Sequence, residues 1–397
     1  MEIKELIKNK TSEIEDRVIE IRRQIHANPE LGFEEIDTAR LIVEILEDNG
    51  IPCITGIAGT GVIGIIKGCK TSPTVALRAD MDALAIEEKN QTDYASKSKG
   101  KMHACGHDAH IAILIGTAIV LNSYKDKLEG QVKLIFQPAE EGPGGAEPMI
   151  SEGVLDNPSV DTIFGLHVWT DIEAGFVGLK DGPFFASVDD FDLIIKGSSC
   201  HGATPEQGID AVVIAANVVN ALQTIVSRGI RPTEDVVLTI GRIEGGYGRN
   251  IIADQVRLKG TIRCFDPGIR DLIEDKVIKI VSGICDGYGG NYELEYNRMY
   301  PALINDKEMN DILRSVSIEI IGTDKVLEVE RPTLGGEDFA FFLEKVPGSF
   351  FLLGAGNEKK GITAPHHNPY FDIDEGILSM GIEILSCTVV AYLEQRA

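Results

Sequence analysis

The chain has 397 residues, 43% hydrophobic and 25% charged, a composition typical of an ordinary soluble globular protein. Its length predicts two domains rather than one. With 38 basic and 62 acidic residues the net charge is −24, which repels phosphate groups and argues against nucleic acid and anionic membranes as partners. The sequence shows no stretch that approaches the roughly 18 apolar residues of a membrane span and no apolar leader at the N-terminus, so we expect a cytoplasmic protein.

The first part of the chain alternates helical and strand patterns. Apolar residues at helical spacing predict two amphipathic helices, and aliphatic runs predict three strands, with another helix before the last of them. These elements cover residues 14–27, 34–49, 61–67, 74–79, 107–121 and 131–137. The alternation predicts an α/β domain with a mixed, mostly parallel sheet flanked by helices, whose sites gather at the carboxyl ends of the strands.

A second pattern begins near Phe184. Four strands and two helices are predicted at residues 190–196, 209–228, 236–243, 255–265, 268–287 and 292–296. They make a smaller α+β unit that interrupts the first domain. The predicted organisation is residues 1–183 and 298–397 for the α/β domain, with residues 184–297 as the insertion.

The stretch Met102–His110 contains three histidines, a cysteine and an aspartate in nine residues. Cys105 and His107 are two apart and cannot share a helix face, but they can converge if Gly106 forms a turn into the next helix. A thiolate with an imidazole suits zinc. The same pair could equally be a nucleophile and its base, so this stretch alone leaves both readings open.

The seven cysteines are scattered without a CxxC pair, which predicts reduced thiols. We expect six of them to be small buried hydrophobic residues and Cys105 to be the exception, because it lies among other candidate ligands.

Further candidate ligands follow other predicted strands. Glu140 and Glu141 come after the strand at 131–137, and His167 lies in an apolar run. Taken separately, Glu140 and Glu141 could simply form a solvated acidic turn, and His167 could be an ordinary histidine of the core. Together with the cysteine stretch and the pair His366 and His367, they supply enough ligands for two metal ions and a spare glutamate as general base.

Several motifs extend this pattern over nearly the whole chain. They lie at residues 22–26, 29–33, 77–84, 102–110, 136–142, 165–167, 221–228, 336–339 and 367–369. With them the sequence resembles the co-catalytic metallo-amidohydrolases and exopeptidases that include aminoacylase, hippurate hydrolase, auxin-conjugate hydrolases and bacterial carboxypeptidases. The Cys-Gly-His motif is similar to the aminoacylase, hippurate hydrolase and auxin-conjugate hydrolase branch. The resemblance implies that the insertion is a lid and dimerisation domain, and that the protein is a homodimer or a dimer-based tetramer.

The resemblance also implies roles for individual residues and two divalent ions: zinc, manganese, cobalt or nickel. Asp82 would orient a ligand, and His367 is preferred over His366 because it stands two residues before a proline. His201 would stabilise the oxyanion, often across a dimer, while Asn250 and Arg263 would grip the substrate. The implied metal ligands are Cys105, which could bridge the ions, His107, Glu141, His167 and His367, and Glu140 is the implied general base.

The sequence departs from the family pattern at Glu206, Ser199–Cys200 and Ala85. The first of these departures, Glu206, affects the expected substrate preference more than the chemistry. The expected function is metal-dependent hydrolysis of N-acyl amino acids or short peptides. Alternatives on the same residues are a metallocarboxypeptidase and an N-acetyl-diaminopimelate deacetylase. Alternatives of another class are a cysteine hydrolase, which would survive chelators, and a non-catalytic metal-binding protein.

Overall fold

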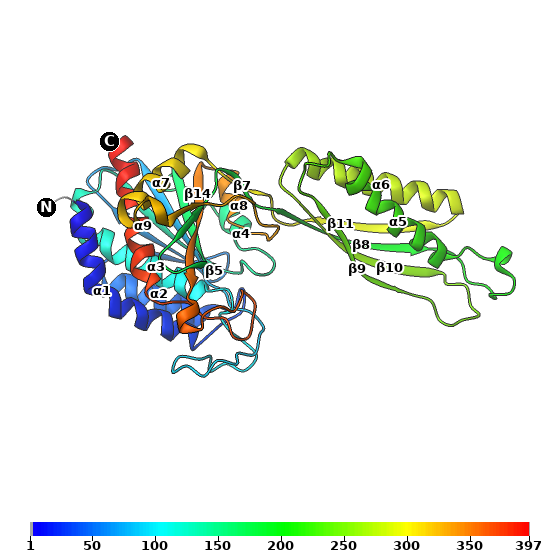
Figure 1. Cartoon of the computed structure of the whole chain (residues 1–397), viewed down its shortest axis with the longest axis horizontal. Helices are drawn as coiled ribbons and strands as arrows, with labels where there is room; N and C mark the ends of the chain where they lie inside the picture. Colours follow the sequence, from blue (N-terminus) through cyan, green and yellow to red (C-terminus); the bar gives the residue numbers. More distant parts are fainter. Residues whose placement is uncertain (1–2, 397) are drawn as a thin grey trace. The chain divides into compact units, whose positions relative to one another are not determined.

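The chain forms two compact units in a computed structural model, which describes residues 3–396 (Figure 1). The first unit comprises the chain up to Gly182, Ile304–Arg331 and the chain from Phe341 onward. The second comprises Pro183–Leu303 and Pro332–Ala340. The insertion predicted at residues 184–297 lies inside the second unit.

The first unit is built on an eight-stranded sheet in the order β1-β2-β4-β3-β5-β14-β6-β13. The four central strands β4, β3, β5 and β14 run parallel, whereas β1, β2 and the contact between β14 and β6 are antiparallel. This confirms the predicted mixed sheet. The strands are β1 (Cys53–Ile57), β2 (Gly61–Lys67), β3 (Thr74–Asp80), β4 (Gln131–Gln137), β5 (Thr162–Glu173), β6 (Val177–Leu179), β13 (Val326–Glu328) and β14 (Gly348–Gly356).

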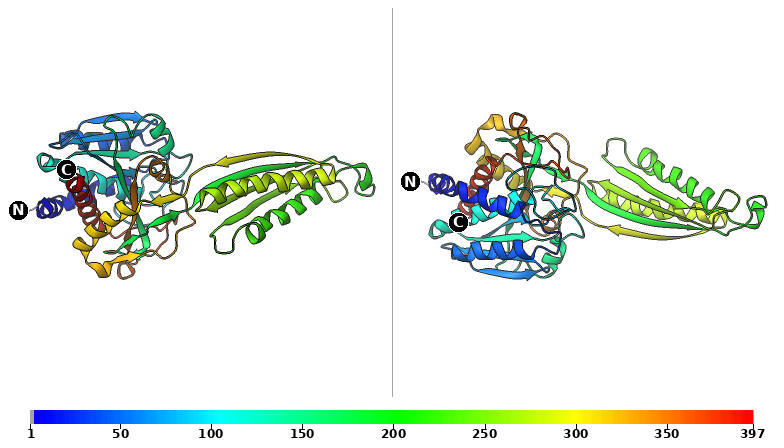
Figure 2. Two further views of the ribbon diagram at one scale, coloured as in Figure 1. Left: turned by 90° about the horizontal axis from the view of Figure 1, so that it is seen from above. Right: turned by 90° about the horizontal axis from the view of Figure 1, so that it is seen from below.

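The helices of this unit flank the sheet. Helices α1, α3 and α9 contact one another, and Figures 1 and 2 show the first and last helices side by side. Their close approach depends on Gly116 of α3, where a Cβ would lie 2.3 Å from Ile382 of α9 and 3.1 Å from Val18 of α1. The helices are α1 (Ile3–His26), α2 (Ile36–Asp48), α3 (His107–Ser123), α4 (Ala146–Ser151), α7 (Lys307–Ile321), α8 (Ala340–Leu343) and α9 (Ile377–Arg396).

Strand register determines where the site forms. Strands β3 and β4 are buried along their whole length and pair from Thr74 with Gln131 to Asp80 with Gln137. Their carboxyl ends therefore meet at one edge of the sheet. His167 was expected at a strand end, but it lies within β5, which continues to pair with β14 beyond its contact with β3.

The second unit is a four-stranded antiparallel sheet in the order β11-β8-β10-β9, packed against two helices. Alternate residues of β8 and β10 are buried against α5 and α6, so the other face of the sheet carries mostly polar side chains. The elements are β8 (Ser187–Lys196), α5 (Ala211–Gly229), β9 (Val237–Gly245), β10 (Gln255–Cys264), α6 (Pro267–Tyr288) and β11 (Asn291–Arg298). Strands β7 (Gly182–Phe185) and β12 (Leu303–Asn305) pair with each other on the connecting segments.

Two sequence-based expectations need correction. Helices α5 and α9 are long and apolar enough to cross a membrane by length and composition, contrary to the expectation that no stretch approaches that length. Helix α9 is a core helix, with 72% of its apolar window buried, and α5 buries 33% against its own sheet. All seven cysteines are free, as predicted, but Cys69 is exposed and Cys53 and Cys200 are half-buried, so fewer than six serve as core hydrophobic residues.

A buried charge cluster joins the N-terminal helix to α3 and to the C-terminal loop. Arg22 is fully buried, and its Nε donates to Asp108 Oδ2 at 2.7 Å. The same guanidinium donates to Asp372 at 3.0 Å and to Glu375 at 3.3 Å. The Arg22 guanidinium and the His26 imidazole outweigh burial and hold the pKa of Asp108 below its usual range. One arginine thus holds two segments that also carry candidate metal ligands.

Replacing Arg22 by methionine should destabilise the protein by about 3–5 kcal/mol, because it leaves buried carboxylates without their counter-ion. The neighbouring Arg23 is the matched control: its ion pair with Glu375 is half-exposed, so Arg23→Met should cost less than about 1 kcal/mol. Urea unfolding of both variants measures the difference. Equal losses would contradict the assignment of the cluster to Arg22.

Candidate active site

The turn before α3 brings a thiol and an imidazole to the edge of the sheet. Gly106 precedes the helix with φ of 88°, a left-handed conformation that glycine adopts without strain. A Cβ at Gly106 would lie 2.3 Å from Val168 Cγ2, so a larger residue does not fit. The turn places buried Cys105 on one side of the glycine and His107, the first helical residue, on the other. This is the convergence that the sequence predicted.

Two histidines are oriented by backbone carbonyls. His107 Nδ1 lies 2.9 Å from the carbonyl oxygen of Asp82, and His167 Nδ1 lies 2.7 Å from that of Val168. Each contact places a proton on Nδ1, so Nε2 is the nitrogen that could bind a metal. His167 Nε2 lies 3.4 Å from Cys105 Sγ, and His107 Nε2 is buried without a hydrogen-bond partner among residues 3–396. Tethering through one ring nitrogen is typical of metal-ligating histidines.

The acidic turn after β4 is held by Asp82. The backbone N–H groups of Glu140 and Glu141 donate to the two oxygens of the Asp82 carboxylate, each at 2.9 Å. Glu141 Oε1 lies 2.9 Å from Nε2 of His367, whose own N–H donates to the Ala104 carbonyl at 2.8 Å. Asp82 therefore acts on the two glutamates through their backbone, and on His107 through its own carbonyl group.

The predicted ligands form two overlapping groups. Cys105 belongs to one group with His107 and His167 and to another with Glu141 and His367, with ligand atoms within 4.8 Å of one another in each. His107 also forms a group with Glu140 and Glu141. The donor set fits two metal ions, since it combines sulfur, imidazole and carboxylate groups with the unpartnered Nε2 of His107. The sharing of Cys105 agrees with the predicted bridging position.

The electrostatics of the site favour a bound cation. Burial and the neighbouring Glu141 and Glu140 carboxylates raise the pKa of the Cys105 thiol well above its usual value. Burial lowers the pKa of His107, but Asp80 and Asp82 outweigh it and raise the value to about 10. The shift of His107 reflects the negative charge of the two aspartates, whereas the shift of Cys105 comes first from burial and then from the two glutamates. A divalent cation would offset this charge and displace the ligand protons.

Two further histidines near the site, His110 and His366, already have hydrogen-bond partners. His366 Nε2 donates to the Val168 carbonyl at 2.8 Å, which supports the choice of His367 as the ligand. His110 lies 2.6 Å from Asp80 through Nδ1 and accepts the Val168 N–H at Nε2, so neither nitrogen is available to a metal. The second oxygen of Asp80 accepts a hydrogen bond from Arg78 at 2.7 Å.

The predicted substrate-binding residues lie in the second unit. His201 and Asn250 occupy adjoining turns: Gly202 N–H donates to the Asn250 carbonyl, and His201 bridges Ile251. Arg263 is half-buried near the far end of β10. The structure therefore brings the ligands, Glu140 and Asp82 together in the first unit, but it does not group Arg263 with His201 and Asn250.

The sequence did not indicate two residues that support the site through hydrogen bonds. Glu35 accepts the Ala139 N–H, and Asp108 links the Cys105 turn to Arg22. The motif at residues 22–26 contained Arg22, but its spacing gave no sign of its partners, which lie at positions 108, 372 and 375.

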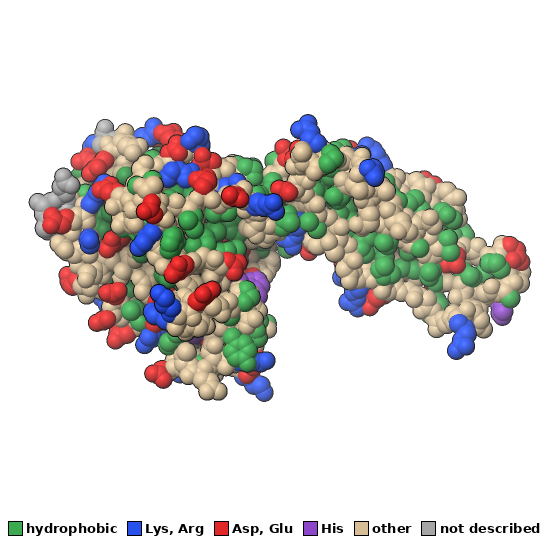
Figure 3. All heavy atoms as spheres, viewed as in Figure 1, with side chains coloured by type: hydrophobic (Ala, Val, Ile, Leu, Met, Phe, Trp, Pro, Cys, Tyr) green, Lys and Arg blue, Asp and Glu red, His purple; other side chains and the backbone are tan. Residues whose placement is uncertain are grey.

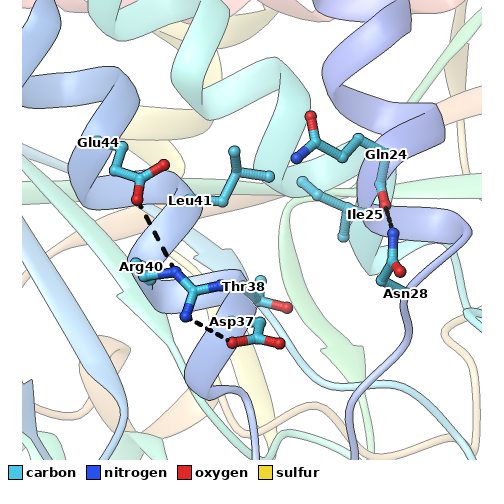
Figure 4. A pocket seen from close by; sticks show the side chains of 8 residues that line it. All are labelled: Gln24, Ile25, Asn28, Asp37, Thr38, Arg40, Leu41 and Glu44. Carbon is cyan, nitrogen blue, oxygen red and sulfur yellow. Dashed lines mark hydrogen bonds and ion pairs between the residues drawn. The ribbon is translucent and has the colours of Figure 1, made fainter.

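A separate hollow of about 220 Å³ lies between α1 and α2 (Figure 4). Its one basic side chain, Arg40, is paired with Asp37 at 3.0 Å and lies 3.8 Å from Glu44. Asn28 donates to the Gln24 carbonyl at 2.7 Å. The polar groups of this hollow are thus engaged with one another, and it offers no histidine or cysteine.

Comparison with known proteins identifies the family. The model of peptidase family M20/M25/M40 matches residues 76–391. The chain belongs to this family. It is 43% identical to thermostable carboxypeptidase 2 of Saccharolobus solfataricus, over 96% of both chains. It is 40% identical to the N-acetyl-L-cysteine deacetylase of Bacillus subtilis, over 92% of this chain and 85% of that protein.

A solved structure of a Bacillus subtilis protein, described as a dinuclear metal-binding peptidase from the M20 family, superimposes with a TM-score of 0.84. It is 35% identical over 96% of this chain and 99% of that one. Membership of the family confirms the predicted resemblance and the prediction of an enzyme that hydrolyses linear amides. The dinuclear neighbour supports the prediction of two metal ions.

Replacing Cys105 by alanine should weaken metal binding more than about 100-fold and lower the metal content of both positions, since even indirect partners of a ligand are worth 10–100-fold. Elemental analysis after equilibration with zinc, manganese or cobalt measures the metal content per chain. Cys285→Ala is the matched control, because this cysteine is buried in the core of the second unit. Unchanged metal content in Cys105→Ala would contradict the shared-ligand arrangement.

Proposed function

We propose that the protein hydrolyses the amide bond of N-acyl amino acids and releases a carboxylic acid and a free amino acid. The observation that carries the proposal is the buried Glu140 beside the clustered candidate metal ligands of the first unit. The kinship to a carboxypeptidase and to a deacetylase of an N-acetyl amino acid supports it, since both descriptions refer to amides adjoining an amino acid. A metallocarboxypeptidase and an N-acetyl-diaminopimelate deacetylase remain the alternatives.

Cys105, His107, Glu141, His167 and His367 would hold two divalent ions, which would polarise the amide carbonyl and lower the pKa of a water molecule. Glu140 accepts a proton from this water as its oxygen attacks the carbonyl carbon. The carbon–nitrogen bond then breaks, and Glu140 passes the proton to the leaving amine. Asp82 keeps Glu140 in place by holding its backbone N–H. From the family resemblance, His201 stabilises the oxyanion, and Asn250 and Arg263 bind the substrate's carbonyl and carboxylate groups.

Replacing Glu140 by glutamine should lower kcat by at least about 100-fold while leaving metal content unchanged, because it removes the base and retains the shape of the side chain. The assay is release of free amino acid from N-acetyl, N-benzoyl and indole-acetyl amino acids, N-acetyl-diaminopimelate and several dipeptides. It is run first on metal-free protein and then with zinc, manganese or cobalt. A dipeptide as best substrate would favour the carboxypeptidase. Full activity of the variant, or activity that survives without metal, would refute the mechanism.

The geometry of the second unit supports a homodimer. His201 and Asn250 lie beyond one end of β10, whereas Arg263 is eight residues along this strand from Gln255, or roughly 26 Å. An N-acyl amino acid is only about 10 Å long. One copy therefore cannot place both His201 and Arg263 on the same substrate, and a second copy would supply one of them.

The surface of the second unit offers a face for this partner. Strand β9 is an edge strand, with unpaired backbone groups that a second β9 can complete. Apolar side chains gather over α5 and the adjacent strands, around a hollow of about 440 Å³ (Figure 3). Ile243 of β9 and Val212 of α5 are 58% and 48% exposed there. An isologous pair of these faces would bury both.

Mixing two inactive variants tests the shared site. His201→Ala and Glu140→Gln chains, combined after dissociation and reassociation, should recover about a quarter of wild-type activity, because half of the dimers are mixed and each has one intact site. Homodimers of either variant are the controls. Adding Ile243→Asp to both chains should abolish recovery and convert the protein to a monomer by light scattering. Absence of recovery in verified mixed dimers would show that His201 does not act in the partner's site.

A further inference from the structure

The turn that carries the predicted general base is held by two carboxylates. Three successive backbone N–H groups point to acidic side chains: that of Ala139 donates to Glu35 Oε1, and those of Glu140 and Glu141 donate to Asp82. All three distances are 2.9 Å. Asp82 follows a strand of the same sheet, but Glu35 comes from the loop that leads into α2.

The backbone of this turn needs external support. Ala139 is buried and has φ of 53°, a left-handed conformation that costs an alanine about 1 kcal/mol or more. The loop around Gly32 packs directly against it, since a Cβ at Gly32 would lie 2.9 Å from Ala139 Cβ. Because Ala139 immediately precedes Glu140, its φ and ψ set the direction in which the Glu140 side chain leaves the backbone.

The Glu35 side chain accepts a hydrogen bond from this turn and does not cap its own helix. It is the N-cap residue of α2, yet its side chain makes no capping hydrogen bond. Glu30 takes that role instead and accepts the N–H groups of Asp37 and Thr38 at 3.1 and 2.8 Å. The Glu35 carboxyl is fully buried, burial raises its pKa, and its second oxygen accepts the Thr60 hydroxyl at 2.6 Å. Because both oxygens of this buried carboxyl accept hydrogen bonds, the side chain is held in one position.

We propose that Glu35 is a positioning residue for Glu140: its hydrogen bond to the Ala139 N–H maintains the left-handed backbone that aims the Glu140 carboxylate. This inference rests on the proposed role of Glu140 as the general base. Asp82 holds the N–H groups of both glutamates, but Glu141 is affected less because it stands one residue further from Ala139 than Glu140 does. Replacing Glu35 should therefore lower kcat more than it weakens metal binding.

The test compares two substitutions of similar size. Glu35→Gln retains an acceptor for the Ala139 N–H and can donate to the Thr60 hydroxyl, whereas Glu35→Met removes the acceptor. Glu35→Met should lower kcat about 10–100-fold, with KM within about threefold and metal content unchanged, because a displacement near 1 Å costs about that factor. Glu35→Gln should stay within about threefold of wild-type kcat. Thr60→Val, which removes the other partner of Glu35, should also retain kcat within about threefold.

Each outcome decides the proposal. A purely structural role would lower the melting temperature of Glu35→Met but leave kcat of the folded, metal-loaded enzyme unchanged, and this would overturn it. Loss of kcat in Glu35→Gln equal to that in Glu35→Met would also overturn it. If Glu35→Met fails to fold, the double variant Glu35→Met/Thr60→Val, which removes both members of the buried pair, replaces it. If Glu140→Gln is fully active, the proposed function fails; if Glu140→Gln is inactive and Glu35→Met is normal, only the role of Glu35 fails.

Discussion

Asp82 links two segments of the chain that carry candidate site residues. Its carbonyl oxygen orients His107, and its carboxylate accepts the N–H groups of Glu140 and Glu141. A single residue at the end of β3 thereby connects the turn before α3 with the turn after β4. These links form because β3 and β4 are parallel neighbours in register, so that their carboxyl ends lie together. The backbone hydrogen bonds of the sheet thus determine the distances between the candidate ligands.

The candidate ligands are held in position by contacts with the rest of the protein. Carbonyl groups fix the rings of His107 and His167, and the Cys105 turn is locked by a glycine that has no room for a side chain. The buried charge cluster around Arg22 holds the C-terminal loop that carries His367 against the start of α3. A site prearranged in this way pays little further ordering entropy when cations enter. The buried carboxylates of Asp80, Asp82 and Glu140 also favour cation binding electrostatically.

The second unit has a different design. Its sheet is antiparallel, with one face packed on two helices and an exposed edge strand, and it places its candidate substrate residues at opposite ends of one strand. The proposed pairing of two copies would satisfy the edge strand and the exposed apolar side chains of α5 together. Catalysis and assembly would then depend on neighbouring strands of the same sheet, β10 and β9.

The sequence by itself determined the candidate chemistry, and the kinds and order of most elements up to residue 137 and in the insertion. Strands β2 and β4 were predicted with their observed bounds, because continuous aliphatic runs between turns specify buried strands. Strand β1 was missed, because its residues are largely exposed and leave no hydrophobic pattern. The motifs identified a cysteine, histidines and adjacent glutamates as candidate ligands, since residue type decides which metals and proton transfers are chemically available.

Only the tertiary structure decided which residues support the others. The partners of Arg22, the bond from Ala139 to Glu35 and the pairing of His110 with Asp80 join positions tens to hundreds of residues apart, and local spacing carries no information about such contacts. His366 and His367 are adjacent and of the same residue type, and the family resemblance preferred His367 by its spacing to a proline. The fold distinguishes them because the first donates to Val168 while the second, at φ of 62°, faces Glu141. Residue type decides which ligand atoms the chain can offer to a metal. Contacts between residues far apart in the sequence decide where those atoms come together.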